Sequence, residues 1–138
     1  MKLILRTLPL VVFALVMGGC SDDPEGPTTP TPPVTFTENF NGTLTPNGAK
    51  THSFSTQASG EITATLSSLA PDATISVGLA LGTWNGVLCQ IVLPNDNAVV
   101  TTVVKGAASA VASLCVRISD VTATVKEPTE YEIVVVHP

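Results

Sequence analysis

Residues 60–66 read Gly-Glu-Ile-Thr-Ala-Thr-Leu, an alternation of apolar and polar side chains that decides the fold class. A period of two indicates a β-strand with one buried face, because successive side chains point to opposite sides of a strand. The same period returns in residues 114–118 and 131–135, and residues 75–81 carry a second apolar row. The sequence therefore predicts strands from residue 35 onward.

Turn signals separate these runs. Three are Asn-Gly pairs, which tolerate the positive φ of tight turns, and three place proline beside a polar residue. They lie at residues 41–42, 47–48, 71–72, 85–86, 94–97 and 127–128. Several short strands at this spacing predict an all-β fold, an antiparallel β-sandwich. Only the alanine-rich residues 107–112 leave a helical turn open.

The N-terminus has a different pattern. Lys2 and Arg6 precede an apolar run at residues 8–16, and compact residues follow up to Cys20. Positive charge, an apolar core and compact residues in this order are typical of a secretory signal peptide. The run has about half of the roughly 20 apolar residues that a membrane-crossing helix needs, which argues against an uncleaved anchor. Residues 1–19 are therefore expected to be removed.

Residues 17–20, Met-Gly-Gly-Cys, resemble the lipobox of bacterial lipoproteins, with Met17 in place of the usual leucine. The resemblance implies diacylglycerol on the Cys20 sulfur and an acyl chain such as palmitate on its new amino group. One acyl chain binds a membrane marginally, whereas two or more anchor a protein stably. Ser21 after the cysteine implies the outer membrane in the Gram-negative sorting rule of that family. A secreted protein with an incidental cysteine is the alternative.

Residues 20–34 are expected to be a disordered tether. Prolines alternate with threonines there, and almost no apolar residue is present to offset the entropy of ordering. Proline-rich chain extends about 3.1 Å per residue, so the tether can hold a domain some tens of Å from a membrane. Residues 35–138 are then one folded domain.

The charge of the mature chain argues against a nucleic-acid partner. Eleven acidic and four basic side chains remain after residues 1–19 are removed, a net charge of about −7. Phosphate binding depends on lysine and arginine. The acidic residues are spread along the chain, which favours a role in solubility.

Three cysteines are an odd number for an exported protein. With Cys20 assigned to lipid, Cys89 and Cys115 remain as a pair in an oxidising compartment. A disulfide across about 26 residues contributes roughly 3–4 kcal/mol in the chain-entropy model, a large share of a domain's stability. A zinc site is disfavoured, because only His52 and His137 accompany the cysteines and no CxxC or HxxxH spacing occurs.

Residues 35–138 resemble the bacterial pre-peptidase C-terminal domain. Its opening strands resemble residues 40–44, 51–54 and 60–66, and its closing strands resemble residues 114–118 and 131–135. The resemblance implies a β-sandwich of jelly-roll type. It also implies a non-catalytic accessory module of secreted peptidases, associated with substrate or surface binding or with secretion. The aspartate-rich strand of that family is replaced here by residues 71–77, and the Cys89/Cys115 pair is added.

Trp84, Asn85 and Asp96 are the candidate ligand-binding residues. Sugar binding needs an aromatic surface backed by polar groups, and Trp84 lies just before the Asn85-Gly86 turn, where a loop tip can expose it. Asn85 and Asp96 would supply the polar groups. The competing interpretation is a tryptophan folded over the end of the sandwich.

Calcium is a weaker candidate ligand, because it requires several clustered oxygens. The candidate ligands are Asp72, Asn95, Asp96, Asn97 and Asp120. Asx side chains also stabilise turns by themselves, which is the favoured interpretation. No other cofactor is expected.

Catalytic motifs are missing from the sequence. A hydrolase needs an activated nucleophile beside a base, but His52 and His137 both lie in expected strands, and no GxSxG, HExxH or P-loop occurs. The sequence therefore predicts a non-catalytic, lipid-anchored protein of the cell envelope that displays a binding module for a surface glycan or an envelope protein. A structural or accessory subunit of an envelope or secreted-peptidase complex is the alternative.

Overall fold

The computed structural model describes Gly26, Thr29 and residues 31–138. The expected signal peptide, Cys20 and most of the expected tether lie outside the described residues. The compact unit is Pro32–Pro138, and it contains the whole described hydrophobic core. Within the described part of the chain there are strands and no helix, so the predicted all-β class is confirmed.

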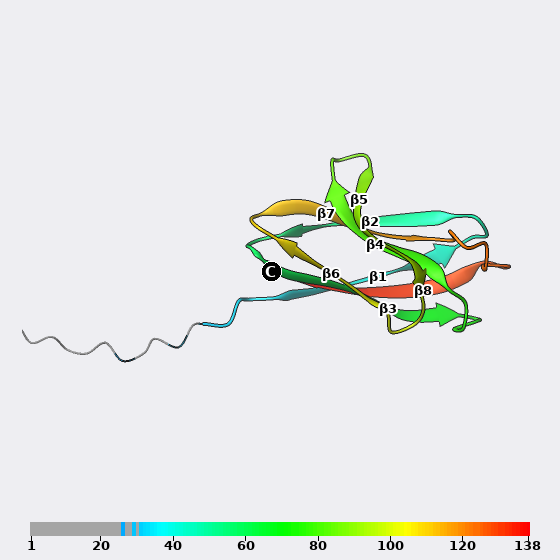
Figure 1. The fold of residues 1–138 in the computed structure, drawn as a ribbon, viewed down its shortest axis with the longest axis horizontal. Coiled ribbons are helices and arrows are strands. Elements are labelled where there is room, and N and C mark those ends of the chain that lie inside the picture. Colours follow the sequence, from blue (N-terminus) through cyan, green and yellow to red (C-terminus); the bar gives the residue numbers. More distant parts are fainter. Residues whose placement is uncertain (1–25, 27–28, 30) are drawn as a thin grey trace, which may run out of the picture. The chain divides into compact units, whose positions relative to one another are not determined.

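Eight strands build this unit (Figure 1). They are β1 (Phe36–Leu44), β2 (Ala49–Thr56), β3 (Gly60–Ala70), β4 (Val77–Trp84), β5 (Cys89–Ala98), β6 (Val103–Ala108), β7 (Ala112–Ser119) and β8 (Thr129–His137). Every neighbouring pair is antiparallel.

The strands form two four-stranded sheets, ordered β1-β8-β3-β6 and β2-β7-β4-β5. The pairs β1·β8, β2·β7, β3·β6 and β4·β5 are those of one long hairpin, and the pairs β3·β8 and β4·β7 form where that hairpin winds over itself. This arrangement is the jelly roll, in which two sheets enclose one core. The predicted antiparallel sandwich of jelly-roll type is confirmed.

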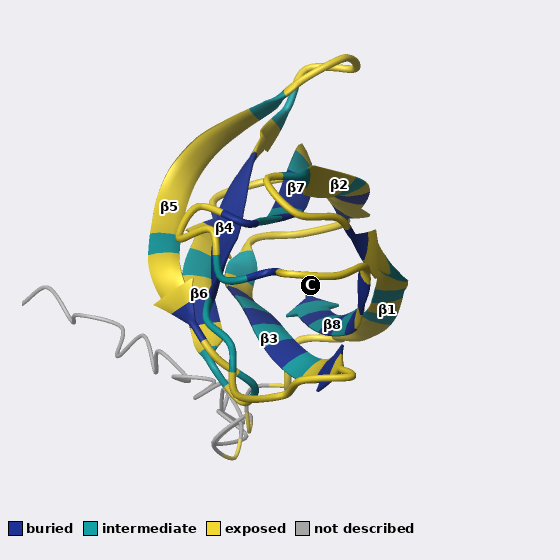
Figure 2. Ribbon diagram, turned by 90° about the vertical axis from the view of Figure 1, so that its right-hand side faces the viewer, coloured by how far each residue is buried: buried dark blue, intermediate teal, exposed yellow. Residues whose placement is uncertain are grey.

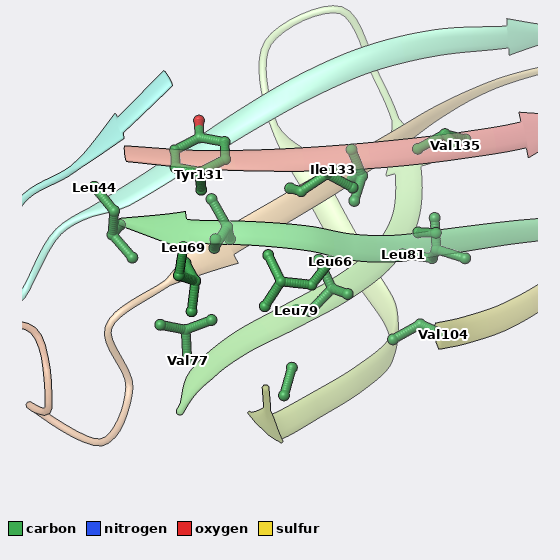
Figure 3. Packing of buried hydrophobic residues seen from close by; sticks show 14 of the residues in the cluster. Leu44, Leu66, Leu69, Val77, Leu79, Leu81, Val104, Tyr131, Ile133 and Val135 are labelled. Carbon is green, nitrogen blue, oxygen red and sulfur yellow. The ribbon is translucent and has the colours of Figure 1, made fainter. Parts of the chain in front are cut away.

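The core lies between the two sheets and is formed by the alternation seen in the sequence. Ile62, Ala64 and Leu66 of β3 are at most 3% exposed, as predicted for one face of residues 60–66. Leu66 is the cross-strand partner of Ile133 on β8, and both are fully buried. Figure 3 shows these side chains packed with Leu79.

Aromatic and histidine rings close the side of the sandwich between β1 and β2. Phe40 stacks on His52 with ring centroids 4.9 Å apart, and Phe54 lies between Phe40 and His137 at 6.4 and 5.2 Å. Nε2 of His52 lies 2.8 Å from the Tyr131 hydroxyl. Burial, together with the nearby charge of Lys50, lowers the pKa of His52, so a neutral ring occupies this apolar row at neutral pH.

The turn predicted at residues 41–42 was wrong. Gly42 lies inside β1 and faces Tyr131 across the β1·β8 ladder. A Cβ at position 42 would lie 3.1 Å from the Cζ atom of Tyr131, so the tyrosine ring packs directly on the glycine backbone. The residue is glycine because of close cross-strand packing, as also occurs in other sheets where an aromatic ring covers a glycine.

The turn predicted at residues 94–97 was also wrong. Residues 94–97 belong to β5 instead of a turn, and Pro94 is tolerated because β5 is an edge strand. The helical turn that the sequence left open at residues 107–112 does not form, since these residues end β6 and begin β7. The other predicted turns, at residues 47–48, 71–72, 85–86 and 127–128, all lie between strands.

Candidate functional site

Exposed apolar side chains gather on the β4–β5 hairpin. Val87 is 77% exposed, Leu88 64% and Val92 60%, and Ile91 is exposed as well. In Figures 1 and 2 the loop that joins β4 to β5 extends beyond both sheets, and Figure 2 shows β5 exposed along most of its length. We call Trp84 together with these four residues the hairpin surface.

Asp96, near the end of β5, is the one charged residue of this hairpin. Residues 73–95 contain no Asp, Glu, Lys, Arg or His, and the nearest charges in the sequence are Asp72 and Asp96. In the sequence, Trp84 is the one residue of this surface predicted to contact a ligand. The missing signal was the charge-free stretch, in which residues 91–93 are all apolar and depart from the alternation of the other strands.

The tip of the hairpin is held by Asn85. Its Oδ1 accepts hydrogen bonds from the backbone N–H groups of Val87, at 2.9 Å, and Leu88, at 2.7 Å. Its own N–H donates to the Leu88 carbonyl at 3.2 Å. Gly86 has a φ of +95°, a conformation that glycine adopts without strain. Asn85 is therefore part of the framework of the tip, and the predicted turn is confirmed.

The base of the hairpin is fixed by the predicted disulfide between Cys89 and Cys115, which the structure contains. Cys89 begins β5 and Cys115 lies on β7, although β4 separates these strands in the sheet. Strands two places apart are normally about 9.5 Å from each other. The two Cα atoms are only 5.8 Å apart, so the start of β5 rises over the outer face of β4.

Gly82 makes this crossing possible. It is the partner of both Ile91 on β5 and Cys115 on β7, and its missing side chain would point to the outer face. A Cβ at position 82 would lie 2.8 Å from the carbonyl carbon of Gln90 and 3.1 Å from the Cα of Ile91. Any other residue would push β5 away from the sheet.

The structure does not bring the three candidate ligand-binding residues together. Trp84 is half-buried and pairs with Cys89, next to Asn85. Asp96 lies toward the other end of β5, whose Asn95 pairs with Leu79. Trp84 and Leu79 are five residues apart on β4, a distance of about 17 Å along the strand, so Asp96 lies about this far from Trp84. Asp96 instead lines a separate hollow of about 290 Å³ on the outer face of the second sheet.

Of the five candidate calcium ligands, Asp96 and Asp120 line the same hollow. Asp72, Asn95 and Asp120 each accept hydrogen bonds from nearby backbone N–H groups. Oδ1 of Asp72 accepts hydrogen bonds from the N–H and hydroxyl of Thr74, which lower the pKa of this exposed carboxyl group. Oδ1 of Asn95 accepts the N–H of Asn97 at 3.0 Å. In the part of the chain that the structure describes, no group of three or more His, Cys, Asp or Glu side chains is arranged to hold a metal ion.

Asp120 ties two loops together. Its carboxylate accepts backbone N–H groups from Asn47, at 2.9 Å, from Thr124, at 2.9 Å, and from Val125, at 3.2 Å. Desolvation would raise the pKa of Asp120, but these three donors and the charge of Lys126 outweigh it, so the pKa lies below its ordinary value. Asp120 is thus a structural carboxylate that joins the β1–β2 turn to the loop before β8.

A second hollow, of about 510 Å³, lies on the outer face of the first sheet. Its polar lining includes Glu130 and Glu132 of β8, Asn41 of β1 and Ser68 of β3. In the sequence the two glutamates fit the polar half of an alternating strand. Their cross-strand neighbours could not be recognised before the strand order was known.

The comparisons with known proteins do not assign a family. No protein-family model matches the chain, and no curated protein is similar to it. The resemblance to the pre-peptidase C-terminal domain therefore remains a prediction. Among the described residues, no helix has the length and hydropathy needed to cross a membrane.

Replacement of Asp120 by Asn should destabilise the domain in a pH-dependent way. At neutral pH the free energy of unfolding should fall by about 1.5–3 kcal/mol, the range for hydrogen bonds to a charged group. The pKa of Asp120 is lower in the folded state than in the unfolded state. The carboxylate therefore stabilises the fold fully at pH values above its unfolded-state pKa. This contribution is lost as the pH falls through its folded-state pKa. When urea unfolding is measured from about pH 5 toward about pH 2, the difference in free energy of unfolding between wild type and Asp120→Asn should shrink.

Asp96→Asn is the matched control, because Asp96 is exposed. It should change the free energy of unfolding by no more than about 0.5 kcal/mol. A gap between wild type and Asp120→Asn that stays constant over the whole pH range would contradict the structural assignment of Asp120.

The double replacement Cys89→Ser/Cys115→Ser should lower the free energy of unfolding by about 3–4 kcal/mol, since the unfolded chain loses its cross-link. Gly82→Ala should also destabilise the domain, because the added Cβ meets the backbone of Gln90. Urea unfolding of the wild type, of each of these two variants and of the variant that combines them forms a double-mutant cycle. The cost of Gly82→Ala should be smaller without the disulfide, because β5 can then move away from β4. Strictly additive costs would show that the disulfide does not hold β5 against Gly82.

Proposed function

We propose that the protein is a non-catalytic, lipid-anchored protein of the bacterial cell envelope whose β-sandwich contacts the envelope through the β4–β5 hairpin. One observation carries the choice of contact site. The hairpin surface exposes apolar side chains on a charge-free loop whose tip and base are both fixed. Groups of exposed apolar side chains on soluble domains mark interaction sites.

The sequence supports the proposed anchor. Residues 17–20 resemble a lipobox, and diacylglycerol on Cys20 would account for the one cysteine that is not in the disulfide. Ser21 favours the outer membrane under the sorting rule of that family. The tether at residues 20–34 would then display the folded domain at the membrane surface.

The environments of the two histidines support a role without catalysis. Nε2 of His52 lies 2.8 Å from the Tyr131 hydroxyl, and Nε2 of His137 lies 2.9 Å from Oε1 of Glu38. Both rings pack in the aromatic row between β1 and β2. A general base must instead lie within hydrogen-bond reach of the nucleophile that it activates.

A second candidate function is that of an accessory subunit of an envelope or secreted-peptidase complex. It is favoured by a small apolar hollow of about 100 Å³ between β5 and β6, lined by Ile62, Leu81, Val92 and Leu93 among others. A hollow of this size fits an apolar side chain of a partner protein. A surface glycan at Trp84 is less well supported, because Asp96 lies far along β5 from it.

The anchor is tested on the mature protein from its native host. Mass spectrometry of the N-terminal peptide should show Cys20 carrying diacylglycerol and an amide-linked acyl chain. Cys20→Ala should move the protein from the membrane fraction to the soluble fraction, because a bare chain lacks the buried methylene groups that hold it. A mature N-terminus at another residue, or unchanged membrane partition of Cys20→Ala, would contradict the anchor.

The contact site is tested by hydroxyl-radical footprinting of the same protein in intact envelopes and after detergent extraction. Trp84, Val87 and Leu88 should be labelled less in the envelope, because a bound partner excludes solvent from them. Val111 is a matched internal control, since it is 69% exposed on the loop between β6 and β7. Equal labelling of the hairpin in both states would contradict the proposed contact site.

A further inference from the structure

We infer that the tip of the β4–β5 hairpin, Trp84, Val87 and Leu88, inserts into the interface of a lipid bilayer. The inference rests on the proposed function, since it names the partner of the same hairpin. The partner is a zwitterionic lipid surface, the membrane to which Cys20 would tether the chain.

The order of side chains along the tip matches the polarity of a bilayer. Val87 and Leu88 are 77% and 64% exposed in the loop, and Trp84 ends β4 at the base of that loop. Aliphatic side chains partition into the acyl region, whereas tryptophan prefers the boundary with water. No charged group, which is costly at that depth, occurs in residues 73–95.

The backbone of the tip is prepared for an environment without water. Hydrocarbon offers no hydrogen bonds, so polar backbone groups that enter it need partners within the protein. Asn85 provides partners for several of them, because its Oδ1 accepts the N–H groups of Val87 and Leu88 and its own N–H donates to the Leu88 carbonyl. An ordinary exposed loop would leave these groups to water.

The hairpin is also fixed before it binds. The disulfide holds Cys89 against Cys115, and the close passage of β5 over Gly82 limits movement of the base. A binding element that is already ordered loses little conformational entropy on association.

The length and charge of the chain favour a bilayer over other occupants. Between Cys20 and β1 lie 15 residues, so at about 3.1 Å each the tether keeps the domain within roughly 50 Å of the membrane. At that distance the effective concentration of lipid is high, and a small apolar tip suffices. The mature chain is acidic, which disfavours anionic lipid and leaves a zwitterionic surface as the matching partner.

The test uses the compact unit Pro32–Pro138, which has its own core and disulfide and lacks the anchor. Trp84 is the only tryptophan of the chain, so its emission reports on the tip alone. Vesicles of phosphatidylcholine should shift this emission to shorter wavelength, and lipids brominated on the acyl chains should quench it. Added phosphatidylglycerol should weaken both effects.

Leu88→Asp should lower the partition coefficient about tenfold or more, because the substitution removes one buried leucine from the lipid contact and adds a charge. Val111→Asp adds the same charge at a site of similar exposure, 69% against 64%, and should leave the coefficient unchanged. Circular dichroism of both variants checks that the fold is retained, and bromine quenching of the wild type needs no variant.

Three results would overturn the inference: no change in emission with any vesicle, equal effects of the two aspartate variants, or an emission change that follows protein concentration without lipid, which indicates a second copy as occupant. If the hairpin is protected from hydroxyl radicals in intact envelopes but vesicles cause no change in Trp84 emission, bilayer insertion is rejected and the proposed function is retained. Vesicle insertion without protection in envelopes would reject the proposed function and retain the lipid affinity of the tip.

Discussion

The crossing of β5 over β4, fixed by the Cys89–Cys115 disulfide, is the constraint on which the exposed surface of the molecule depends. In β4 the inward residues are large, and the outward residues Gly78, Ala80 and Gly82 are small and buried. Only this pattern allows the start of β5 to lie 5.8 Å from β7. Because the start of this edge strand crosses the outer face of β4, no further strand covers it, and Val87, Leu88 and Val92 are exposed to solvent.

The two open sides of the sandwich are closed by different means, and this difference locates the candidate site. Between β1 and β2, the packed rings of Phe40, His52, Phe54 and His137 fill the gap. Between β5 and β6 no ring is present among the lining residues, and Leu93 covers Gly106 over a small apolar hollow. An edge strand with free backbone groups and apolar side chains is a typical place for association.

The sequence allowed most of the strands, the disulfide and most turns to be predicted, because each depends on local pattern, on a family resemblance or on cysteine parity. No such pattern marked β5 or β6. Gly42 and Pro94 were assigned to turns although they lie in strands, because their roles depend on neighbouring strands. Tyr131 covers the glycine, and the edge position of β5 tolerates the proline. Trp84 was recognised, but its distance from Asp96 required the register of β4 and β5. The exposed apolar hairpin surface could be recognised only once the strand order showed that β5 is an edge strand with β4 as its one neighbour in the sheet.

The proposed hairpin contact alone would bind a membrane weakly, and the proposed lipid anchor alone would not orient the domain. Together they would hold the domain at the membrane in one orientation. Full burial of an apolar side chain contributes about 1.5–3 kcal/mol, so a three-residue tip gains at most about 9 kcal/mol. Loss of translational and rotational freedom opposes binding by about 4–15 kcal/mol, so a free domain binds a bilayer weakly and its insertion is measured at high lipid concentration. A lipid on Cys20 would remove most of that entropic cost in advance but would leave the domain free to rotate. The hairpin then acts as an orientation device, selecting which face of the acidic sandwich is turned away from the membrane.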